Sequence, residues 1–429
     1  MKLTKTNKMK DTSIKIAVYG QGKMGLPLAQ VMAQYYKVIG VDINKNLVEN
    51  LNKGINPIKD EHGLSELLTQ NLKSKNYEAT TDFSYASKNS NIHIILVPTL
   101  IKENKPDLSI VKDVAKKIID GLKKNDIVIT ECTMPPGSTE MLIPVLEESG
   151  LKYLADFWLA HCPERTMTGT AIRDITGQYP KIIGACDERT LKIVKEIYEK
   201  INNKGTIVMS SIVAAEMVKV FEGCYRDVNI ALANELSYVC EKYKINSEEI
   251  FKAANSQPYC HIHNPGYVGG HCIPYYPWFV IDKNTKLMRT ARKINENVIN
   301  TLIMKVIKGL NECNVTIRDS NILILGLTFR GNVYEFEHTP AKPFIEKLKK
   351  FNPKIYAYDP MCKAEDYKRF GVEFKNDFKN IDCVVILADH KEFYSIDWDK
   401  ASREMRNKVI VDIRGVVDES KAKLSVLKL

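Results

Sequence analysis

One stretch near the N-terminal end restricts the fold of this chain more than any other. Residues 14–19 are mostly β-branched or apolar, which predicts a short buried strand of a parallel sheet. Gly20, Gly22 and Gly25 follow at once in a GxGxxG arrangement, and residues 26–35 then have helical spacing. A strand, a glycine-rich turn and a helix in this order indicate a nucleotide-binding α/β unit.

A second predicted strand, residues 37–41, ends at Asp42, 22 positions after Gly20. A dinucleotide-binding fold places an acid there to bind the hydroxyls of the adenosine ribose, while Lys23 and Met24 complete the phosphate-binding turn. Because Asp42 would repel a 2′-phosphate and no Arg adjoins it, the sequence predicts NAD rather than NADP. The alternative is a turn that only resembles this fingerprint.

The alternation of strands and helices continues with predicted strands over residues 92–97 and 126–130 and a helix over residues 109–122. Thr99 and Thr133 follow the two strands. Open α/β sheets bind ligands at the carboxyl ends of their strands, so both threonines are expected to touch the cofactor.

A further strand is predicted near residues 153–159, before the segment that runs from His161 to Arg165. Glu164 is then a carboxylate at the carboxyl edge of the sheet. Taken alone, it is more often a charge that begins a helix than a catalyst.

Residues 211–242 contain no Pro and one glycine, Gly223, and have apolar residues at helical spacing. This length exceeds that of a crossover helix and predicts a helix that links two lobes. Lys219 and Arg226 lie seven positions apart and share one face. By pattern alone, the favoured interpretation of Lys219 is a solvated surface lysine.

A second series of strands and helices follows the helices predicted over residues 247–255 and 285–310. It has no GxGxxG, so we expect it to bind a nucleotide differently, with Arg330 and Arg414 near strand ends as partners of phosphate. Its predicted strands cover residues 321–326, 354–359, 383–387 and 409–412, and its predicted helix covers residues 340–350.

The chain of 429 residues is too long for one core, so two or three domains are expected. The predicted class is α/β, with two Rossmann-like doubly wound parallel-sheet domains joined by a long central helix and a small helical domain. The predicted boundaries are 11–205 for the dinucleotide-binding domain, 206–310 for the helical linking domain and 311–429 for the second Rossmann-like domain.

The most unusual loop of the chain surrounds Cys272. Three glycines and two prolines lie within residues 265–274, so this segment cannot form a regular helix. Such a composition suits a fixed loop that lies close to a ligand and presents a thiol. The alternative is a tight turn that carries a buried cysteine, the commoner environment of a free thiol.

Composition excludes several classes of protein. The formal charge is +10, but the lysines are spread along the chain, which argues against a nucleic-acid partner and is compatible with small anionic ligands. No apolar run approaches the roughly 18 residues of a membrane span. Residues 1–10 are basic without an apolar stretch behind them, so we interpret them as a solvated tail. Ten cysteines without a secretory signal indicate reduced thiols in a cytoplasm.

A metal site is not expected. Cysteine and histidine gather between residues 260 and 272, but their spacing is irregular and a glycine-rich piece interrupts it. Zinc sites usually have four ligands at regular spacing.

Along essentially its whole length the chain resembles the UDP-glucose/GDP-mannose dehydrogenase family, and most closely the branch that acts on UDP-N-acetylated hexosamines. Several motifs occur in the order of the family. They are residues 20–25, 97–99, 162–165, 215–219, 225–230, 269–274 and 326–331.

The resemblance implies a four-electron oxidation of the C6 alcohol of a nucleotide sugar with two NAD. Cys272 would capture the aldehyde as a thiohemiacetal, which becomes a thioester and is hydrolysed. Glu164 and Thr133 would position or activate water, and Lys219 would stabilise the oxyanion. The implied substrate-binding residues are Glu164, Arg165, Lys219, Arg226, Tyr267, Gly269, Gly270, Arg330 and Arg414.

Two departures from the family pattern leave the proton acceptor of the first oxidation open, and a third leaves the sugar open. Gly223 stands where the family usually has Asn, and Tyr276 stands where it usually has Asp. Residues 333–338 replace a segment with paired Asp and Arg. Glu164, Lys219 and Tyr276 are the candidates for the acceptor.

The expected substrate is UDP-N-acetyl-D-mannosamine, for polysaccharide or glycan synthesis in the cytoplasm. UDP-N-acetylglucosamine or UDP-glucose is the alternative. An alternative of another class is a non-catalytic paralogue that binds NAD and a UDP-sugar. Members of the family pair through the linking helix, so the resemblance also implies a dimer or a multiple of dimers, with no membrane partner.

Overall fold

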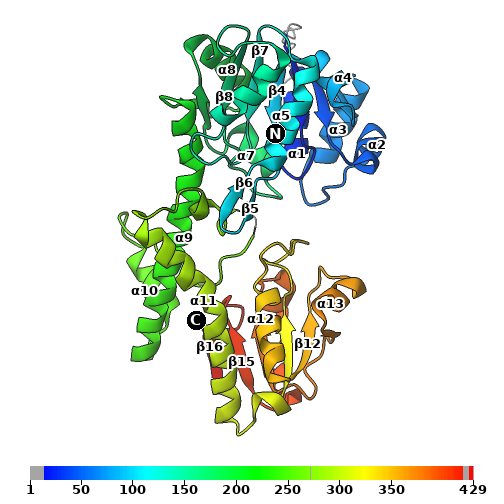
Figure 1. The fold of residues 1–429 in the computed structure, drawn as a ribbon. Coiled ribbons are helices and arrows are strands. Elements are labelled where there is room, and N and C mark those ends of the chain that lie inside the picture. The colour runs from blue at the N-terminus through cyan, green and yellow to red at the C-terminus, as the bar shows by residue number, and fades with distance from the viewer. Residues whose placement is uncertain (1–13, 271, 419–424, 429) are drawn as a thin grey trace. The chain divides into compact units, whose positions relative to one another are not determined.

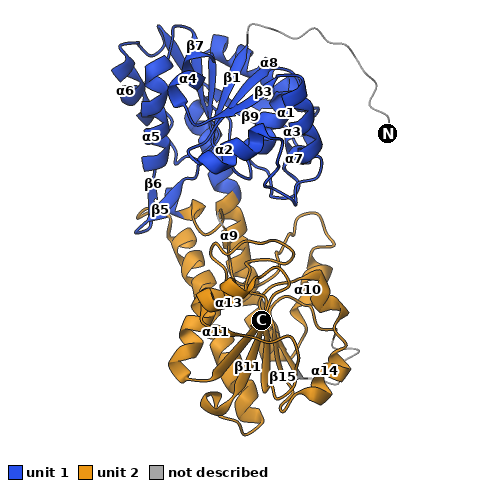
Figure 2. Ribbon diagram, turned by 90° about the vertical axis from the view of Figure 1, so that its right-hand side faces the viewer, with its two compact units in different colours: residues 1–222, 278–280 blue, residues 223–277, 281–429 orange. Residues whose placement is uncertain are grey.

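The structure is a computed structural model that describes residues 14–270, 272–418 and 425–428. The chain divides into two compact units (Figure 2). The first comprises residues 1–222 together with 278–280, and the second comprises residues 223–277 and 281–429. The long helix α9 (Ile212–Tyr243) begins in the first unit and continues into the second.

The first unit contains the elements up to the start of α9 (Figure 1). Its strands are β1 (Lys15–Tyr19), β2 (Lys37–Val41), β3 (Tyr77–Thr80), β4 (Ile92–Ile95), β5 (Leu100–Lys102), β6 (Lys105–Asp107), β7 (Asp126–Thr130), β8 (Phe157–His161), β9 (Lys181–Ala185) and β10 (Thr206–Val208). Its helices are α1 (Gly25–Met32), α2 (Lys45–Asn52), α3 (Leu64–Lys73), α4 (Phe83–Lys88), α5 (Ser109–Ile118), α6 (Ile143–Leu146), α7 (Ala171–Gly177) and α8 (Glu188–Ile201).

The second unit continues from α9. Its strands are β11 (Asn321–Leu325), β12 (Lys354–Tyr358), β13 (Glu373–Phe374), β14 (Cys383–Ile386), β15 (Val409–Asp412) and β16 (Ser425–Lys428). Its further helices are α10 (Ser247–Ala254), α11 (Lys286–Glu312), α12 (Ala341–Leu348), α13 (Ala364–Phe370) and α14 (Trp398–Glu404).

The main sheet of the first unit has eight strands in the order β10-β9-β8-β7-β4-β1-β2-β3. Its pairs are parallel except β8 with β9. The run from β3 to β8 has the 3-2-1-4-5-6 order of a dinucleotide-binding fold once the hairpin β5-β6 is left out. The direction of winding therefore reverses between β1 and β4, where such a fold binds its ligand.

Helices cover both faces of this sheet because alternate residues of each strand point to opposite sides. Ile16 and Val18 belong to a core shared with α1, α3 and α8. Ala17 and Tyr19 belong to a second core shared with α5 and α6. This arrangement confirms the predicted doubly wound α/β class and explains the continuous apolar character of the buried strands.

The second sheet repeats the same topology. Its six parallel strands have the order β13-β12-β11-β14-β15-β16, which is again 3-2-1-4-5-6 along the chain. Ile322 and Ile324 pack with α11 and α12, and Leu323 and Leu325 pack with α14. The prediction of a second Rossmann-like domain is thus confirmed.

One predicted strand was placed too early. The sequence indicated a strand near residues 153–159, whereas β8 spans Phe157–His161 and includes His161. Residues 154–156 form a turn in which Leu154 has a positive φ of 62° and the N–H of Asp156 donates to the carbonyl of Lys152. No strand was predicted for β3, β9 and β10 of the first sheet, for β13 and β16 of the second, or for the hairpin β5-β6. Within the described part of the chain, no helix has the length and apolar character that crossing a membrane requires.

Candidate active site

The glycine turn after β1 is built for close approach. Gly20 has a φ of +99°, and a Cβ on it would lie 2.2 Å from the carbonyl oxygen of Leu96. A Cβ on Gly25 would lie 1.9 Å from the carbonyl oxygen of Gly20. Neither position accepts a side chain without movement of the backbone. Gly22 differs, because a Cβ there would meet no atom of the described residues within 4 Å.

Asp42 holds this turn against the end of β2. Its Oδ2 accepts the N–H of Gln21 at 2.9 Å, and its Oδ1 accepts the N–H of Asn44 at 2.9 Å. A carboxylate therefore lies beside the glycine turn at the carboxyl edge of the sheet, as the sequence predicted. The residues present fit a dinucleotide: Gly22 leaves room for the pyrophosphate, the N-terminus of α1 adjoins it, and Asp42 suits a ribose.

The other predicted cofactor residues lie around the same edge. Lys23 is exposed, and Met24 accepts a contact at its sulfur from the hydroxyl of Thr166 at 2.9 Å. Thr99 and Thr133 follow β4 and β7, which are neighbours in the sheet. The structure thus brings the predicted cofactor residues to one edge of the sheet.

Glu216 of α9 shapes the loop that carries Thr133. Its Oε2 accepts the N–H of Gly137 at 2.5 Å, and its Oε1 accepts the N–H of Thr139 at 2.7 Å. Burial raises the pKa of the Glu216 carboxyl, while the hydrogen bonds from Thr139 and Gly137 act in the opposite direction. Glu216 lies within the family motif of residues 215–219, and no role was predicted for it. These contacts make it the residue that connects α9 to the sheet edge.

Lys219 and Glu164 form the polar centre of the first unit. The Nζ of Lys219 lies 3.6 Å from the Oε2 of Glu164, and the side chains are 8% and 15% exposed. The N–H of Thr166 donates to the other carboxylate oxygen of Glu164. Lys219 is therefore not the solvated lysine that its pattern favoured, and Glu164 does not begin a helix.

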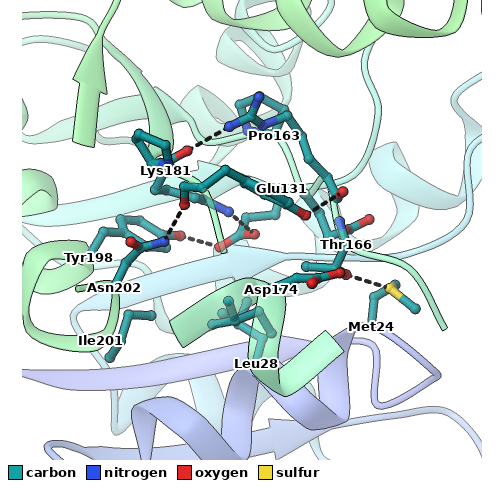
Figure 3. A pocket seen from close by; sticks show the side chains of 15 residues that line it. Met24, Leu28, Glu131, Pro163, Thr166, Asp174, Lys181, Tyr198, Ile201 and Asn202 are labelled. Carbon is teal, nitrogen blue, oxygen red and sulfur yellow. Dashed lines mark hydrogen bonds and ion pairs between the residues drawn. The ribbon is translucent and has the colours of Figure 1, made fainter. Parts of the chain in front are cut away.

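A second polar cluster lies beside Glu164 and was missed from the sequence. Glu131 is buried, with the Nζ of Lys181 at 2.6 Å and a hydrogen bond from the hydroxyl of Tyr198 (Figure 3). Burial raises the pKa of the Glu131 carboxyl, and Lys181 opposes that shift. These residues line one small pocket together with Glu164. Glu131 could have been found from the sequence, because it directly follows the strand predicted over residues 126–130.

Arg165 is bound within the first unit. Its guanidinium donates to the carboxylate of Glu222 at 2.7 Å and to the carbonyl of Pro180 at 2.5 Å, and it lies over the ring of Tyr179. These contacts tie the loop after β8 to α9. They make Arg165 a structural connector, and its predicted role in substrate binding stays a prediction.

The cysteine loop lies in the second unit and is fixed by its glycines. Gly270 has a φ of +87°, and a Cβ on it would lie 3.0 Å from the ring of Phe329. A Cβ on Gly269 would lie 2.5 Å from the carbonyl oxygen of His338. These contacts show why both positions are glycine, which packs the loop closely on the segment after β11. His271 lies outside the described residues.

Cys272 has an exposed thiol. Burial raises the pKa of other thiols of the chain, to about 12 for Cys132 and about 12 for Cys224. A thiolate is the reactive form of cysteine, so these buried thiols are poorly suited to act as nucleophiles. Cys272 is thus open to solvent in its loop, and its role as a nucleophile stays a prediction.

Two asparagines of α9 anchor the start of the loop. The Oδ1 of Asn234 accepts the N–H of Gly266 at 2.7 Å, and its Nδ2 donates to the carbonyl of the same glycine at 3.0 Å. The Oδ1 of Asn229 accepts the N–H of His263 at 2.8 Å. No role was predicted for either asparagine, because the sequence of a helix does not indicate which distant loop its amide side chains bind.

The remaining predicted substrate residues have different surroundings. Arg226 is exposed on α9, and its charge contributes to lowering the pKa of His263, after burial and His261. Tyr267 packs partly against the core of the second unit. Arg414 donates to the carbonyls of Leu387 and Phe329 at 3.0 and 2.9 Å, so much of its guanidinium is engaged by the protein itself.

Arg330 is held near the carboxyl ends of β11 and β12. Thr328 donates from its hydroxyl to the carbonyl of Arg330 at 3.1 Å, and both its N–H and its hydroxyl also contact Asp359. Burial opposes ionisation of Asp359, but the hydrogen bond from His390 and further donors leave the pKa of the carboxyl below its usual range. The loop that carries Arg330 is thus well fixed. Among the described residues, no group of three or more His, Cys, Asp or Glu could hold a metal ion.

Comparison with known families covers nearly the whole chain. Residues 14–202 match the NAD binding domain of the UDP-glucose/GDP-mannose dehydrogenase family, residues 213–297 match its central domain, and residues 323–419 match its UDP binding domain. The three matches follow the order of the two sheets and the helices between them.

Individual relatives are similar over comparable lengths. A UDP-N-acetyl-D-mannosamine dehydrogenase of Methanococcus vannielii is 33% identical over 427 residues, which cover 97% of this chain and 96% of the relative. One of Campylobacter jejuni is 35% identical over 411 residues, with 90% and 98% covered. Among solved structures, a UDP-D-ManNAc dehydrogenase of Pyrococcus horikoshii has a TM-score of 0.89 at 31% identity and covers 97% of this chain and 99% of its own.

Proposed function

This chain belongs to the UDP-glucose/GDP-mannose dehydrogenase family, and we propose that it oxidises UDP-N-acetyl-D-mannosamine to UDP-N-acetyl-D-mannosaminuronate. The observation that carries this choice of sugar is the similarity to UDP-N-acetyl-D-mannosamine dehydrogenases along almost the full length of the chain. Whichever sugar it oxidises, the chain is an oxidoreductase, an NAD-dependent UDP-sugar dehydrogenase.

The two sheets have separate tasks in this proposal. The glycine turn and Asp42 bind NAD, which when bound accepts one hydride in each of two oxidation steps. The second unit binds the UDP moiety, with Arg330 beside the phosphates. The domain boundaries that we propose are 11–205 for NAD binding, 206–310 for linking and the cysteine loop, and 311–429 for the nucleotide sugar.

Cys272 makes the reaction a single four-electron oxidation. Its thiolate adds to the C6 aldehyde and forms a thiohemiacetal, so the reactive aldehyde stays attached to the protein. Oxidation of the thiohemiacetal gives a thioester, and water then releases the carboxylate and regenerates the thiol. The exposure of Cys272 supports this role, because the thiol must reach a bound sugar.

Lys219 and Glu164 provide the charges that these steps require. A buried ammonium stabilises an oxygen that becomes negative during oxidation or hydrolysis, since its charge is poorly screened there. We assign the orientation of the hydrolytic water to Glu164, with Thr133 as a neighbouring hydroxyl. The proton of the C6 alcohol goes to Glu164 or Lys219, whose charged groups lie together.

We also propose that the enzyme is a dimer formed through α9. Within the second unit, four apolar side chains of this helix are about half exposed. They are Tyr225 (53%), Leu232 (47%), Val239 (52%) and Tyr243 (66%). Their spacing of seven, seven and four residues places them along one stripe, as expected for a helix that packs against a partner. A cytoplasmic location and a role in polysaccharide synthesis stay predictions of the resemblance.

A panel of nucleotide sugars tests the choice of substrate. The protein is incubated with NAD and, in turn, UDP-N-acetyl-D-mannosamine, UDP-N-acetylglucosamine and UDP-glucose, and both NADH and acid are followed. We expect the highest kcat/KM with UDP-N-acetyl-D-mannosamine. A higher value with either of the other sugars would reject it as the substrate, and tight binding of a UDP-sugar without turnover would identify a non-catalytic paralogue.

A further inference from the structure

Gly223 has no conformational reason to be glycine. It lies inside α9, far from both ends, and it is not among the described glycines with positive φ. Glycine weakens a helix interior relative to alanine, because it lacks a side chain and loses more backbone entropy on folding. A requirement for space therefore remains as the reason for glycine at this position.

The ring of Tyr276 occupies that space. A Cβ on Gly223 would lie 2.4 Å from the Cδ2 of Tyr276, 2.9 Å from its Cβ and 3.0 Å from its Cγ. The close atoms belong to the root of the tyrosine side chain, so a rotation of the ring alone cannot relieve the clash. Tyr276 is 7% exposed. The smallest residue of α9 and a buried aromatic ring thus fit each other.

Tyr276 is joined to the reactive thiol by one turn of backbone. Its N–H donates to the carbonyl of Cys272 at 3.0 Å, and the N–H of Tyr275 donates to the same carbonyl at 3.0 Å. These two hydrogen bonds close a tight turn between Cys272 and Tyr276. A ring fixed at Gly223 therefore also fixes the position from which the Cys272 side chain leaves the backbone.

The neighbouring tyrosine holds the same turn to another element. The hydroxyl of Tyr275 donates to the Oε1 of Glu337 at 2.8 Å and lies 2.7 Å from the Nε2 of His338. The carbonyl of Glu337 also accepts the N–H of Gly270 at 3.2 Å. Two adjacent tyrosines thus attach the cysteine turn to α9 by shape and to the segment after β11 by hydrogen bonds.

We propose that Tyr276 is a positioning residue, whose ring fills the space at Gly223 and holds the Cys272 turn on α9. This inference rests on the proposed role of Cys272 as the nucleophile. Gly223 begins the part of α9 that belongs to the second unit, so the contact fixes the thiol-bearing turn on that part of the helix. The proposal accounts for two unusual residues, 53 positions apart, with one contact.

A double-mutant cycle tests this contact. The variants are Tyr276→Phe, Tyr276→Ala, Gly223→Ala and the double Gly223→Ala/Tyr276→Ala, with Tyr259→Ala as the control because Tyr259 is 95% exposed. For each, kcat and KM are measured, and the alkylation rate of Cys272 by iodoacetamide is followed by peptide mass spectrometry without substrates. Thermal melting identifies the temperature range in which each variant is folded.

We expect Tyr276→Ala to lower kcat by about 10- to 100-fold with KM changed less than about threefold, because misplacement of a reacting group affects the chemical step. Tyr276→Phe keeps the ring and retains kcat within about fivefold. Gly223→Ala lowers kcat in the presence of Tyr276 but has no further effect on Tyr276→Ala. The alkylation rate of Cys272 changes in Tyr276→Ala and in Gly223→Ala, stays close to the wild-type rate in Tyr276→Phe, and is the same in the double variant as in Tyr276→Ala.

Three results would overturn the proposal. The first is a double variant whose loss of kcat equals the product of the losses in Gly223→Ala and Tyr276→Ala. The others are a wild-type kcat in Tyr276→Ala and a loss of kcat in Tyr276→Phe as large as in Tyr276→Ala. The last result would assign the effect to the hydroxyl rather than to the ring. Alkylation needs no turnover, so it reports on the contact between Gly223 and Tyr276 independently of the reaction. If Cys272→Ala still forms acid, Cys272 is rejected as the nucleophile, but the packing of the turn is not.

Discussion

The Nζ of Lys219 lies 3.6 Å from the Oε2 of Glu164, and both side chains are largely buried. The two residues come from different elements, since Lys219 belongs to α9 and Glu164 follows β8. Opposite charges in a poorly hydrated site interact more strongly than exposed ones. The enzyme thus keeps an ammonium and a carboxylate together at the edge of the first sheet.

Removal of the ammonium should slow the chemical steps. We expect Lys219→Ala to lower kcat by about 100- to 1,000-fold, the usual cost of losing one group that stabilises an oxyanion. Steady-state kinetics measure the effect. Lys195→Ala is the matched control, because Lys195 is half exposed and pairs with Glu199 on the surface of α8. An equal loss in both variants, or none in Lys219→Ala, would contradict this role.

A methyl group at Gly22 should separate cofactor binding from stability. The structure has room for it, so we expect Gly22→Ala to change the free energy of unfolding by less than about 0.5 kcal/mol. NAD binding, measured by calorimetry, should weaken by about tenfold or more because the methyl group occupies the approach of the pyrophosphate. Gly25→Ala is the contrasting variant and should destabilise the fold. Unchanged NAD affinity in Gly22→Ala would place the cofactor elsewhere.

Buried His161 should make the first unit sensitive to acid. Burial, together with the charge of Lys181, lowers the pKa of His161 to about 3, whereas an unfolded histidine titrates near 6.5. Between these values the unfolded chain binds a proton that the native chain does not, so stability present above pH 6.5 is lost as the pH falls. The slope is at most about 1.4 kcal/mol per pH unit.

Urea unfolding at pH 7.5 and pH 5.0 measures this loss. Because Asn does not titrate, we expect the wild type to lose about 2 kcal/mol more than His161→Asn over this interval. Parallel losses in the two proteins would show that His161 does not control the acid sensitivity.

A charge on the exposed stripe of α9 should break the dimer. We expect Leu232→Glu to run as a monomer in size-exclusion chromatography with light scattering, because an unpaired carboxylate would be buried at the interface. Leu287→Glu on α11 is the control, since Leu287 is 68% exposed and lies outside the stripe. A monomeric wild type, or a dimer that persists in Leu232→Glu, would argue against pairing through this stripe.

The sequence predicted the strand, glycine turn and helix of the first βαβ unit well because their signals are local. The turn from Gly20 to Gly25 and the acid at Asp42 belong to one βαβ unit, and the chemistry of glycine determines their positions. The central helix was also predicted nearly to its ends. By contrast, β13 and β16 lie at the two ends of the strand order of the second sheet, where little apolar pattern is required.

The contact between Gly223 and Tyr276 could not be predicted, because 53 residues separate the two positions. In the sequence, each was only a departure from a family pattern. The arginines show the opposite problem. Arg165 and Arg414 follow strands, which favours an anionic ligand, yet Glu222 and backbone carbonyls supply their partners. A sequence does not reveal which acceptors packing brings within reach of a long side chain.

The stoichiometry of NADH and acid tests the central claim most directly. With UDP-N-acetyl-D-mannosamine, the wild type should form about two NADH for each acid, because two hydrides leave C6. Cys272→Ala should form no acid while its NAD affinity is unchanged. One NADH per product in the wild type, or acid formed by Cys272→Ala at the wild-type rate, would contradict oxidation through a thioester on Cys272.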